Sequence, residues 1–133
     1  MANKEKARIM IVDDSEFSRK SMAKILEDEG YNVVGEASKA SEAFEIIKSS
    51  DPNIAIIDIV MPDVNGLELA EHILEKYDDS IEIIMISSLA HEHLILESIS
   101  TGAVDFLQKP FVKEDLIASI DKILTQIKRD ESL

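Results

Sequence analysis

The feature that most constrains the fold of this chain is an alternation, repeated five times, between a short apolar run and a longer segment of helical periodicity. Continuous apolar runs of this length are typical of strands that are covered on both faces, as they are in a parallel sheet. Strict alternation predicts parallel strands joined by right-handed crossovers, with helices on both faces of the sheet. The five runs, rich in Ile and Val, lie at residues 9–12, 33–34, 54–57, 81–86 and 103–107.

Between and after the runs, apolar residues recur every three or four positions, which is the spacing of one face of an α-helix. The pattern is clearest in the second and fifth helical segments. The apolar residues that indicate the five helices are Phe17, Met22, Ile25 and Leu26, which mark the first less cleanly; Ala40, Ala43, Phe44 and Ile47; Leu67, Ala70, Ile73, Leu74 and Tyr77; Leu94, Ile95 and Ile99; and Leu116, Ile117, Ile120, Ile123, Leu124 and Ile127.

The length of the chain limits the architecture further. Its 133 residues suit one domain, which we predict to span residues 1–133 with a core at about 8–128. An open five-stranded sheet fits this length, whereas a closed barrel of parallel strands needs about 250 residues. Gly30 and Gly102 stand just past the first and fourth helical segments, where helix C-caps are expected.

The charge of the chain excludes some classes of function. Its net charge is −13, and it has no basic stripe of the kind that binds a nucleic-acid duplex, so we expect no nucleic-acid partner. Residues 1–8 lack the apolar core of a signal peptide, and no apolar run is long enough to span a membrane. The chain has no cysteine, which fits a reducing compartment, and we expect a cytoplasmic protein.

Polar residues that can carry chemistry follow four of the five apolar runs. In open parallel sheets, ligands bind outside the carboxyl ends of the strands. The first run is followed by Asp13 and Asp14, the third by Asp58, the fourth by Ser87 (and Ser88), and the fifth by Lys109. We therefore expect three carboxylates, a hydroxyl and an ammonium to meet at one edge of the sheet.

Three neighbouring carboxylates repel one another, and a divalent cation relieves this repulsion. Oxygen ligands with open water positions suit Mg²⁺, which favours one or two carboxylates together with phosphate oxygens. A bound metal and the ammonium of Lys109 would offset the charge of a phosphoryl group, which could then approach Asp58. The sequence thus predicts that Asp58 accepts a phosphoryl group in the presence of Mg²⁺.

Each of these residues also has an ordinary structural interpretation. Asp13 and Asp14 could cap the first helix, Ser87 could be a turn residue, and Lys109 could be a surface lysine. Nothing indicates a base that activates a serine. Four scattered glycines cannot supply the glycine-rich loop of a nucleotide-binding enzyme. For His91 and His93, solvated loop residues are favoured over a weak metal site or a local pH effect.

In their order and spacing, these residues resemble the receiver domain of two-component response regulators, from Arg8 to about Lys128. The chain most resembles stand-alone regulators of the chemotaxis type, because it ends about where the last helix is expected to end. The matching fragments are Ile-Val-Asp13-Asp14-Ser, Asp58-Ile-Val-Met61-Pro62-Asp63 followed by Gly66, Met-Ile-Ser87-Ser88, and the stretch from Gly102 to Phe111.

The resemblance implies a flavodoxin-like, doubly wound α/β fold with strand order 2-1-3-4-5, and a cis peptide bond before Pro110. It also implies roles for the acids. Asp58 would accept a phosphoryl group from a histidine phosphate on a partner kinase. Asp14 would ligate Mg²⁺ directly, Asp13 would assist, and the backbone carbonyl of Val60 would be a further ligand.

The same resemblance implies a switch. Ser87 and Lys109 would hold the phosphoryl oxygens, and the movement of Ser87 would let the ring of Phe106 turn inward. The face formed by the fourth helix, the fifth strand and the fifth helix would then change shape and bind a partner protein. Many relatives carry Tyr where this chain has Phe106, so its switching is expected to be less two-state; the alternative for Phe106 is an ordinary core aromatic residue.

The apolar residues Val60 and Leu89 flank the route of the attacking water in the family, so we expect slow self-dephosphorylation. The chain would then be a signalling switch, monomeric or weakly dimeric, and not a turnover enzyme. A chemotaxis-type output is favoured, with a phosphorelay intermediate or an adaptor as alternatives. An aspartate-nucleophile phosphatase typically has an acid where Val60 stands, and a binding module that never meets phosphate would not need Asp14, Asp58 and Lys109.

Overall fold

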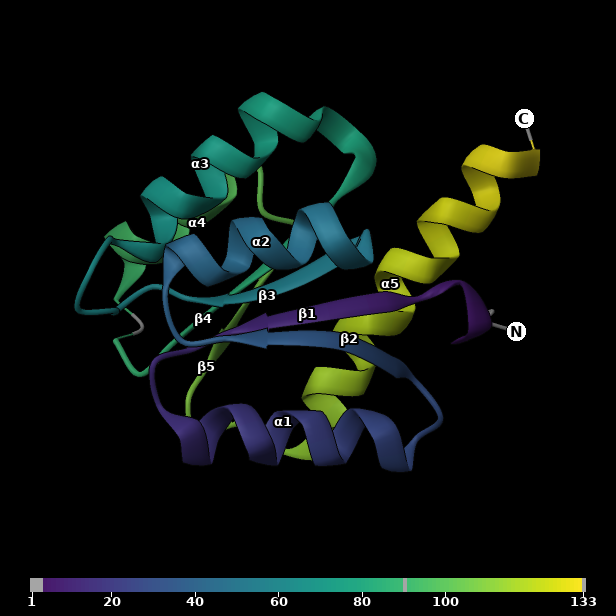
Figure 1. The fold of residues 1–133 in the computed structure, drawn as a ribbon, viewed down its shortest axis with the longest axis horizontal. Helices are drawn as coiled ribbons and strands as arrows, with labels where there is room; N and C mark the ends of the chain where they lie inside the picture. The colour runs from purple at the N-terminus through teal and green to yellow at the C-terminus, as the bar shows by residue number, and fades with distance from the viewer. Residues whose placement is uncertain (1–3, 90, 133) are drawn as a thin grey trace.

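The computed structural model describes residues 4–89 and 91–132, and it describes no side chain at residue 79 or at residues 127–132. Its strands form one sheet of five parallel strands in the order β2-β1-β3-β4-β5. This confirms the predicted flavodoxin-like topology (Figure 1). The strands are β1 (Arg8–Val12), β2 (Asn32–Ala37), β3 (Ile54–Asp58), β4 (Glu82–Ser87) and β5 (Asp105–Gln108).

Helices cover both faces of the sheet, as the alternating pattern predicts. In Figure 1, α2 and α3 lie on one side of the sheet, and α1 and α5 lie on the other. Two 3-10 turns, η1 (Lys4–Lys6) and η2 (Asp78–Ser80), precede β1 and β4. The helices are α1 (Glu16–Asp28), α2 (Ala40–Ser50), α3 (Gly66–Tyr77), α4 (Glu92–Thr101) and α5 (Lys113–Ser132).

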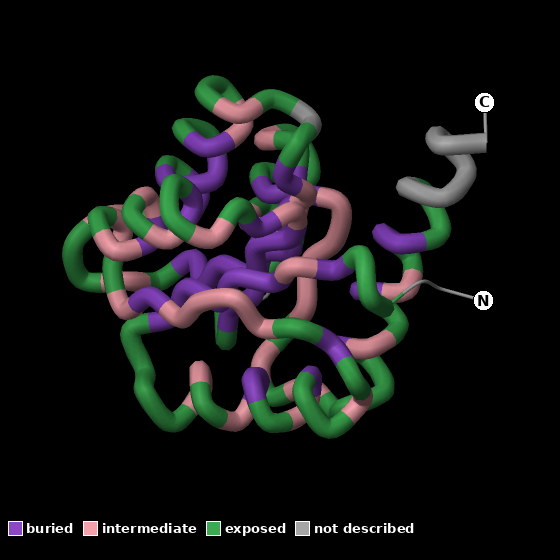
Figure 2. The backbone as a smooth tube through the Cα atoms, turned by 45° about the vertical axis from the view of Figure 1, so that its right-hand side comes forward, coloured by how far each residue is buried: buried purple, intermediate pink, exposed green. Residues whose placement is uncertain are grey.

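The core consists of two apolar layers, one on each face of the sheet. One layer joins the sheet to α2 and α3, and half-buried Leu94 and Phe106 pack against it. The other joins the sheet to α1 and α5. Residues of the central strands contribute to both layers, which is why their sequences are apolar throughout (Figure 2). Ile127 lies outside the residues whose side chains are described.

Two of the apolar residues that indicated helices lie in those helices but are exposed. Phe17 of α1 is 84% exposed, and Ile99 of α4 is 57% exposed. Phe17 lies in the first turn of α1, ahead of the turns that pack on the sheet. In α4 the fully buried position is Ser98, whose hydroxyl donates to the carbonyl of Leu94 at 2.9 Å. Because this bond satisfies its hydroxyl, Ser98 can be buried, although a serine would be expected at the surface from the apolar pattern alone.

β2 is longer than the two valines that predicted it, since it continues through Gly35 and Glu36. It lies at an edge of the sheet, where a polar or small residue is tolerated. The glycine C-cap predictions are confirmed: Gly102 is the C-cap of α4 with φ 114°, and Gly30, with φ 91°, follows the C-cap residue of α1. The predicted cis peptide bond joins Lys109 and Pro110.

Gly66 brings the start of α3 against the end of β3. A Cβ atom at this position would lie 2.1 Å from the carbonyl oxygen of Asp58, so only glycine fits. The N–H of Gly66 donates to the carbonyl of Ile59 at 2.8 Å, and Asn65 caps the helix by accepting from the N–H of Leu67 at 2.7 Å. The loop after Asp58 is thereby held in a fixed path. Of the described helices, none is both long and apolar enough to cross a membrane.

Candidate functional site

Asp13, Asp14 and Asp58 lie together at the carboxyl edge of the sheet, as predicted. Asp13 and Asp14 follow β1, and Asp58 ends the neighbouring strand β3. One carboxylate oxygen of each lies within 4.8 Å of those of the other two, and no other group of this kind occurs among the described residues. Asp13 is fully buried and Asp58 is 6% exposed, whereas Asp14 is open to solvent.

Lys109 enters the cluster from the end of β5. Its ammonium donates to Asp13 Oδ2 at 2.6 Å and to Asp58 Oδ2 at 2.9 Å. The backbone N–H of Lys109 donates to the carbonyl of Ser87 at 2.8 Å, which continues the pairing of β4 with β5. Only 21% of the lysine side chain is exposed. The surface-lysine interpretation is therefore wrong, because this ammonium is committed to two buried acids.

Burial and hydrogen bonding act in opposite directions on the charges of this cluster. Burial raises the pKa of Asp58 above its ordinary value, and the bonds from Lys109 and from the N–H of Val60 only partly offset it. Burial also raises the pKa of Asp13, but bonds from Lys109 and the Ser15 N–H outweigh it, so the net pKa is lowered. Burial lowers the pKa of Lys109, but its two carboxylate partners raise it overall, and the ammonium stays charged.

The helix-cap interpretation of Asp13 and Asp14 is also wrong. The N-cap of α1 is Ser15, whose Oγ accepts from the N–H of Ser18 at 3.2 Å. Asp13 Oδ1 instead accepts from the N–H of Ser15 at 2.9 Å, which fixes the tight turn between β1 and α1. This turn leaves Asp13 Oδ2 and the carboxylate of Asp14 at the acidic cluster.

Ser87 is fully buried at the end of β4, and its Oγ accepts from the N–H of Leu89 at 3.0 Å. This bond leaves the hydroxyl hydrogen available for donation to another oxygen. Among the described contacts, no hydrogen bond joins Ser87 to the three acids. Phe106 is half-buried in β5, opposite Met85 of β4, and packs against the layer that α2 and α3 form.

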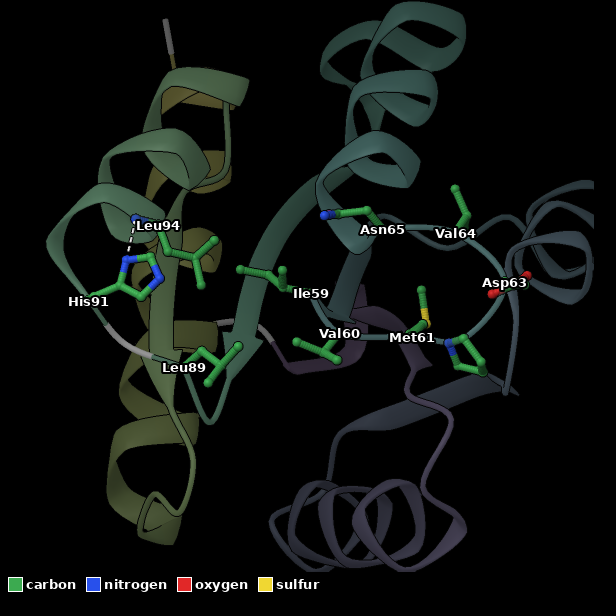
Figure 3. Close-up of a pocket in the computed structure, with 10 residues that line it drawn as sticks. Ile59, Val60, Met61, Asp63, Val64, Asn65, Leu89, His91 and Leu94 are labelled. Atoms are coloured by element: carbon green, nitrogen blue, oxygen red, sulfur yellow. Dashed lines mark hydrogen bonds between the residues drawn. The ribbon is translucent and has the colours of Figure 1, made fainter.

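A cavity of about 340 Å³ opens between the loop that follows β3 and the loop that follows β4 (Figure 3). Val60 and Leu89 line it from these two loops, and each is 53% exposed. The loop expectation for His91 and His93 was only partly right, since both are exposed but His93 lies inside α4. His91 caps α4, with its Nδ1 accepting from the N–H of Leu94 at 3.3 Å.

The donor set fits a hard divalent cation. Three carboxylates supply oxygen ligands of the kind that Mg²⁺ prefers, and the exposure of Asp14 leaves room for water ligands. Sequence reasoning missed Arg19, whose guanidinium donates to the carbonyl of Asp13 at 2.7 Å. No motif marks this residue, and only its position in the first turn of α1, just after the acids, could have drawn attention to it.

Comparisons with known proteins agree with this geometry. A family profile described as the response regulator receiver domain matches residues 9–121. The chemotaxis protein CheY of Thermotoga maritima is 36% identical over 116 residues, covering 87% of this chain and 96% of that protein. CheY of Bacillus subtilis is 35% identical, covering 88% of this chain and 97% of that protein.

Solved structures give the same result. A CheY-like receiver domain protein from Methanospirillum hungatei superposes with a TM-score of 0.84 at 32% identity, covering 93% of this chain and 98% of that one. A chain of the CheX–CheY–BeF3–Mg complex from Borrelia burgdorferi superposes with a TM-score of 0.82 at 30% identity, covering 88% of each chain. The chain therefore belongs to the response regulator receiver domain family and is a receiver domain of two-component signalling.

Proposed function

We propose that this protein is a phosphorylation-activated signalling switch, in which Asp58 accepts a phosphoryl group from a histidine phosphate on a partner kinase. The observation that carries the proposal is the position of Asp58 between a lysine and two further acids. Lys109 Nζ is 2.9 Å from its Oδ2, and Asp13 and Asp14 offer oxygens within 4.8 Å. An acceptor carboxylate needs positive charge on both sides of the incoming phosphoryl group.

The residues of the site divide the work of transfer. A carboxylate oxygen of Asp58 attacks phosphorus, the P–N bond to the donor imidazole breaks, and the bonding electrons stay with the imidazole nitrogen. Asp13, Asp14 and Asp58, with the backbone carbonyl of Val60, would hold Mg²⁺. When bound, this ion would neutralise charge on the phosphoryl oxygens. Lys109 turns from Asp58 Oδ2 to one phosphoryl oxygen, and the hydroxyl of Ser87 donates to another.

The output follows from the displacement of Ser87. In the structure, the Ser87 hydroxyl accepts from the N–H of Leu89 at 3.0 Å, and this bond would break when the hydroxyl moves to the phosphoryl group. The volume that it vacates beside β4 lets Phe106 turn inward, and the surface of α4, β5 and α5 then presents a different shape to a partner protein. We propose a monomer or weak dimer in the cytoplasm, which catalyses only its own phosphorylation and slow dephosphorylation.

A chemotaxis-type output is supported by the two CheY relatives, each of which this chain matches over nearly its whole length. A phosphorelay intermediate or an adaptor remains the alternative. A relay would pass the phosphoryl group on, so labelled protein mixed with a histidine phosphotransfer protein would lose its label to that protein. Retention of label on Asp58 supports a switch.

The decisive experiment is labelling with a small phosphodonor and Mg²⁺. Wild-type protein should acquire an acid-stable, base-labile acyl phosphate, and Asp58→Asn should acquire none. Asp63→Asn is the matched control, because Asp63 is an exposed acid of the same loop that only accepts from the N–H of Ala40. Label that persists in Asp58→Asn would refute the assignment of the acceptor.

A further inference from the structure

The backbone of Asp13 is held from both sides by other elements. Its N–H donates to the carbonyl of Ala37 in β2 at 3.0 Å, and its carbonyl accepts from Arg19 Nη1 in α1 at 2.7 Å. The Asp13 carboxylate is engaged as well, by the Ser15 N–H and by Lys109. The orientation of this acid is thus set by its peptide unit as much as by its side-chain partners.

Arg19 is itself held in place by Glu36 of β2. The guanidinium Nε lies 3.6 Å from Glu36 Oε1, and the arginine side chain is only 14% exposed. Lys20 approaches the same carboxylate, with Nζ 3.1 Å from Oε1 and 3.2 Å from Oε2. Glu36 Oε1 is the one buried side-chain oxygen or nitrogen among the described residues that has no hydrogen bond. The charges of Arg19 and Lys20 compensate this oxygen, so the carboxylate is held between two cations.

An irregularity in β2 aims Glu36 at Arg19. Ile9 pairs with Val33, but the next residue, Met10, pairs with Gly35, so β2 contains one extra residue. In a regular strand, Val33 and Ala37 would share a face of the sheet. Here Val33 packs with the α1 and α5 layer, whereas Ala37 lies in the α2 and α3 layer. The bulge therefore turns the side chains after it to the opposite faces, as bulges beside functional sites often do.

Gly35 lies at the bulge and packs closely on α2. A Cβ atom at this position would lie 2.6 Å from the side chain of Ile46, closer than real side-chain contacts allow. With the bulge in place, Glu36 points to the α1 face, where it meets the guanidinium of Arg19. The bulge in β2, the ion pair of Glu36 with Arg19 and the bond from Arg19 therefore all act on the carbonyl oxygen of Asp13.

We propose that Arg19 and Glu36 form a positioning pair that fixes the Asp13 peptide and thereby sets the Mg²⁺ affinity of the Asp13–Asp14–Asp58 cluster. The inference rests on the proposed function for the identity of the ion. Arg19 touches neither the ion nor the phosphoryl group, and it acts through the backbone of a ligand residue. Residues that orient metal ligands in this way typically change metal affinity by about 10- to 100-fold when they are removed.

The substitution Arg19→Gln separates positioning from simple electrostatics by the sign of its effect. Removing a positive charge near a cation site should, by charge alone, tighten the binding of Mg²⁺. Loss of positioning should weaken it, and we expect the dissociation constant measured by titration calorimetry to rise about tenfold. Lys20→Gln is the matched control. It removes the same charge one residue away and the other cationic partner of Glu36, but it leaves the bond from Arg19 to Asp13 intact, so Mg²⁺ affinity should stay within about twofold of the wild-type value or become tighter.

Two further variants complete the test. Arg19→Lys keeps the charge but cannot reach Asp13 and Glu36 with one planar group, so its affinity should fall about threefold or more. If the pair acts as a unit, Arg19→Gln combined with Glu36→Gln should lose no more affinity than Arg19→Gln alone. Circular dichroism and urea unfolding verify that each variant folds, and Arg19→Lys decides the matter if Arg19→Gln does not fold.

The possible results distinguish this inference from the proposed function. Unchanged or tighter Mg²⁺ binding by folded Arg19→Gln would overturn the inference, and so would an equal loss in Lys20→Gln. Absence of Mg²⁺ binding by the wild-type chain would overturn it together with the metal site. Normal Mg²⁺ binding without label on Asp58 would overturn the proposed function and leave the positioning pair standing.

Discussion

The ammonium of Lys109 lies closer to Asp13 than to the proposed acceptor Asp58, at 2.6 Å against 2.9 Å. The lysine is therefore a shared counterion before any phosphoryl group arrives. Burial raises the pKa of both acids and Lys109 lowers both. Further bonds at Asp13 make its net pKa lower than usual, whereas at Asp58 burial and the charge of Asp13 dominate and raise its pKa.

Replacement of Lys109 by methionine should destabilise the metal-free protein at neutral pH by about 2–4 kcal/mol, because it leaves two buried carboxylates facing each other without a cation. Since the wild-type pKa of Asp13 is lowered, its contribution to stability is present above the unfolded-state pKa and is lost as pH falls below it. The difference between the two proteins should therefore shrink in acid, where both carboxylates are protonated.

Urea unfolding at pH 7 and at a pH well below 3.8, the ordinary pKa of an aspartate, measures this difference. Mg²⁺ should restore part of the stability of Lys109→Met at pH 7. Lys113→Met is the control, because Lys113 pairs with Glu29 at the exposed surface, and its unfolding midpoint should stay close to the wild-type value. An equal loss at both pH values would show that the lysine matters for packing and not for charge.

The hydroxyl of Tyr31 donates to the carboxylate of Asp121 and so joins the start of β2 to α5. Burial, the bond to Asp121 and the negative charge of that residue raise the pKa of Tyr31. The unfolded chain releases this proton near pH 10 while the folded chain retains it, so stability should fall as pH rises above 10.

In Tyr31→Phe this alkaline loss should be smaller, and the lost hydrogen bond should cost about 1 kcal/mol at neutral pH. Thermal unfolding between pH 7 and pH 11 is the measurement, with Tyr77→Phe as the control for the other tyrosine. Identical alkaline profiles for the wild type and Tyr31→Phe would show that the Tyr31 hydroxyl does not govern this loss.

Val60 and Leu89 place two exposed apolar side chains at the cavity between the loops that follow β3 and β4. We expect slow loss of the phosphoryl group in the wild type, since neither side chain can orient an attacking water. Replacing both by glutamine should raise the rate of label loss by about tenfold, which corresponds to about 1.4 kcal/mol in the barrier. The decay of labelled protein after removal of the donor measures the rate, and a wild-type lifetime of seconds would contradict the prediction.

Gly66 lies against the backbone of Asp58, and an added Cβ would meet its carbonyl oxygen at 2.1 Å. Gly66→Ala should therefore cost about 2–3 kcal/mol and displace the loop that carries Val60. Gly30→Ala is an instructive comparison, because φ is +91° there but a Cβ atom would meet only the side chain of Lys4, at 3.9 Å. Its cost should be about 1 kcal/mol, with unchanged Mg²⁺ affinity. Equal Mg²⁺ affinity in both variants would argue against a role for the loop path in metal binding.

The sequence was sufficient for the sheet topology and for the meeting of Asp13, Asp14, Asp58 and Lys109. Both follow from local rules, since parallel strands read as apolar runs and ligand groups stand at their carboxyl ends. The roles of Ser87, Phe106 and the Val60 carbonyl in phosphoryl transfer are still predictions.

Other features depend on contacts that local patterns do not encode. The inward position of Ser98 requires a bond within α4, and the capping role of His91 requires its particular backbone conformation. The bulge that redirects Glu36 lies where Gly35 packs closely on α2. Such features arise from close packing between elements, and periodicity alone does not reveal that Phe17 and Ile99 are exposed.

The presence of Lys109 among the three acids also determines which charge of a bound metal ion would neutralise the site. Three carboxylates and one ammonium carry a formal charge of −2 when all are ionised. A divalent ion brings this set to neutrality, whereas a monovalent ion leaves it negative. In the proposed function, a phosphoryl group that approached the filled site would meet no net repulsion, and Lys109 would balance the charge of the acids before it bound a phosphoryl oxygen.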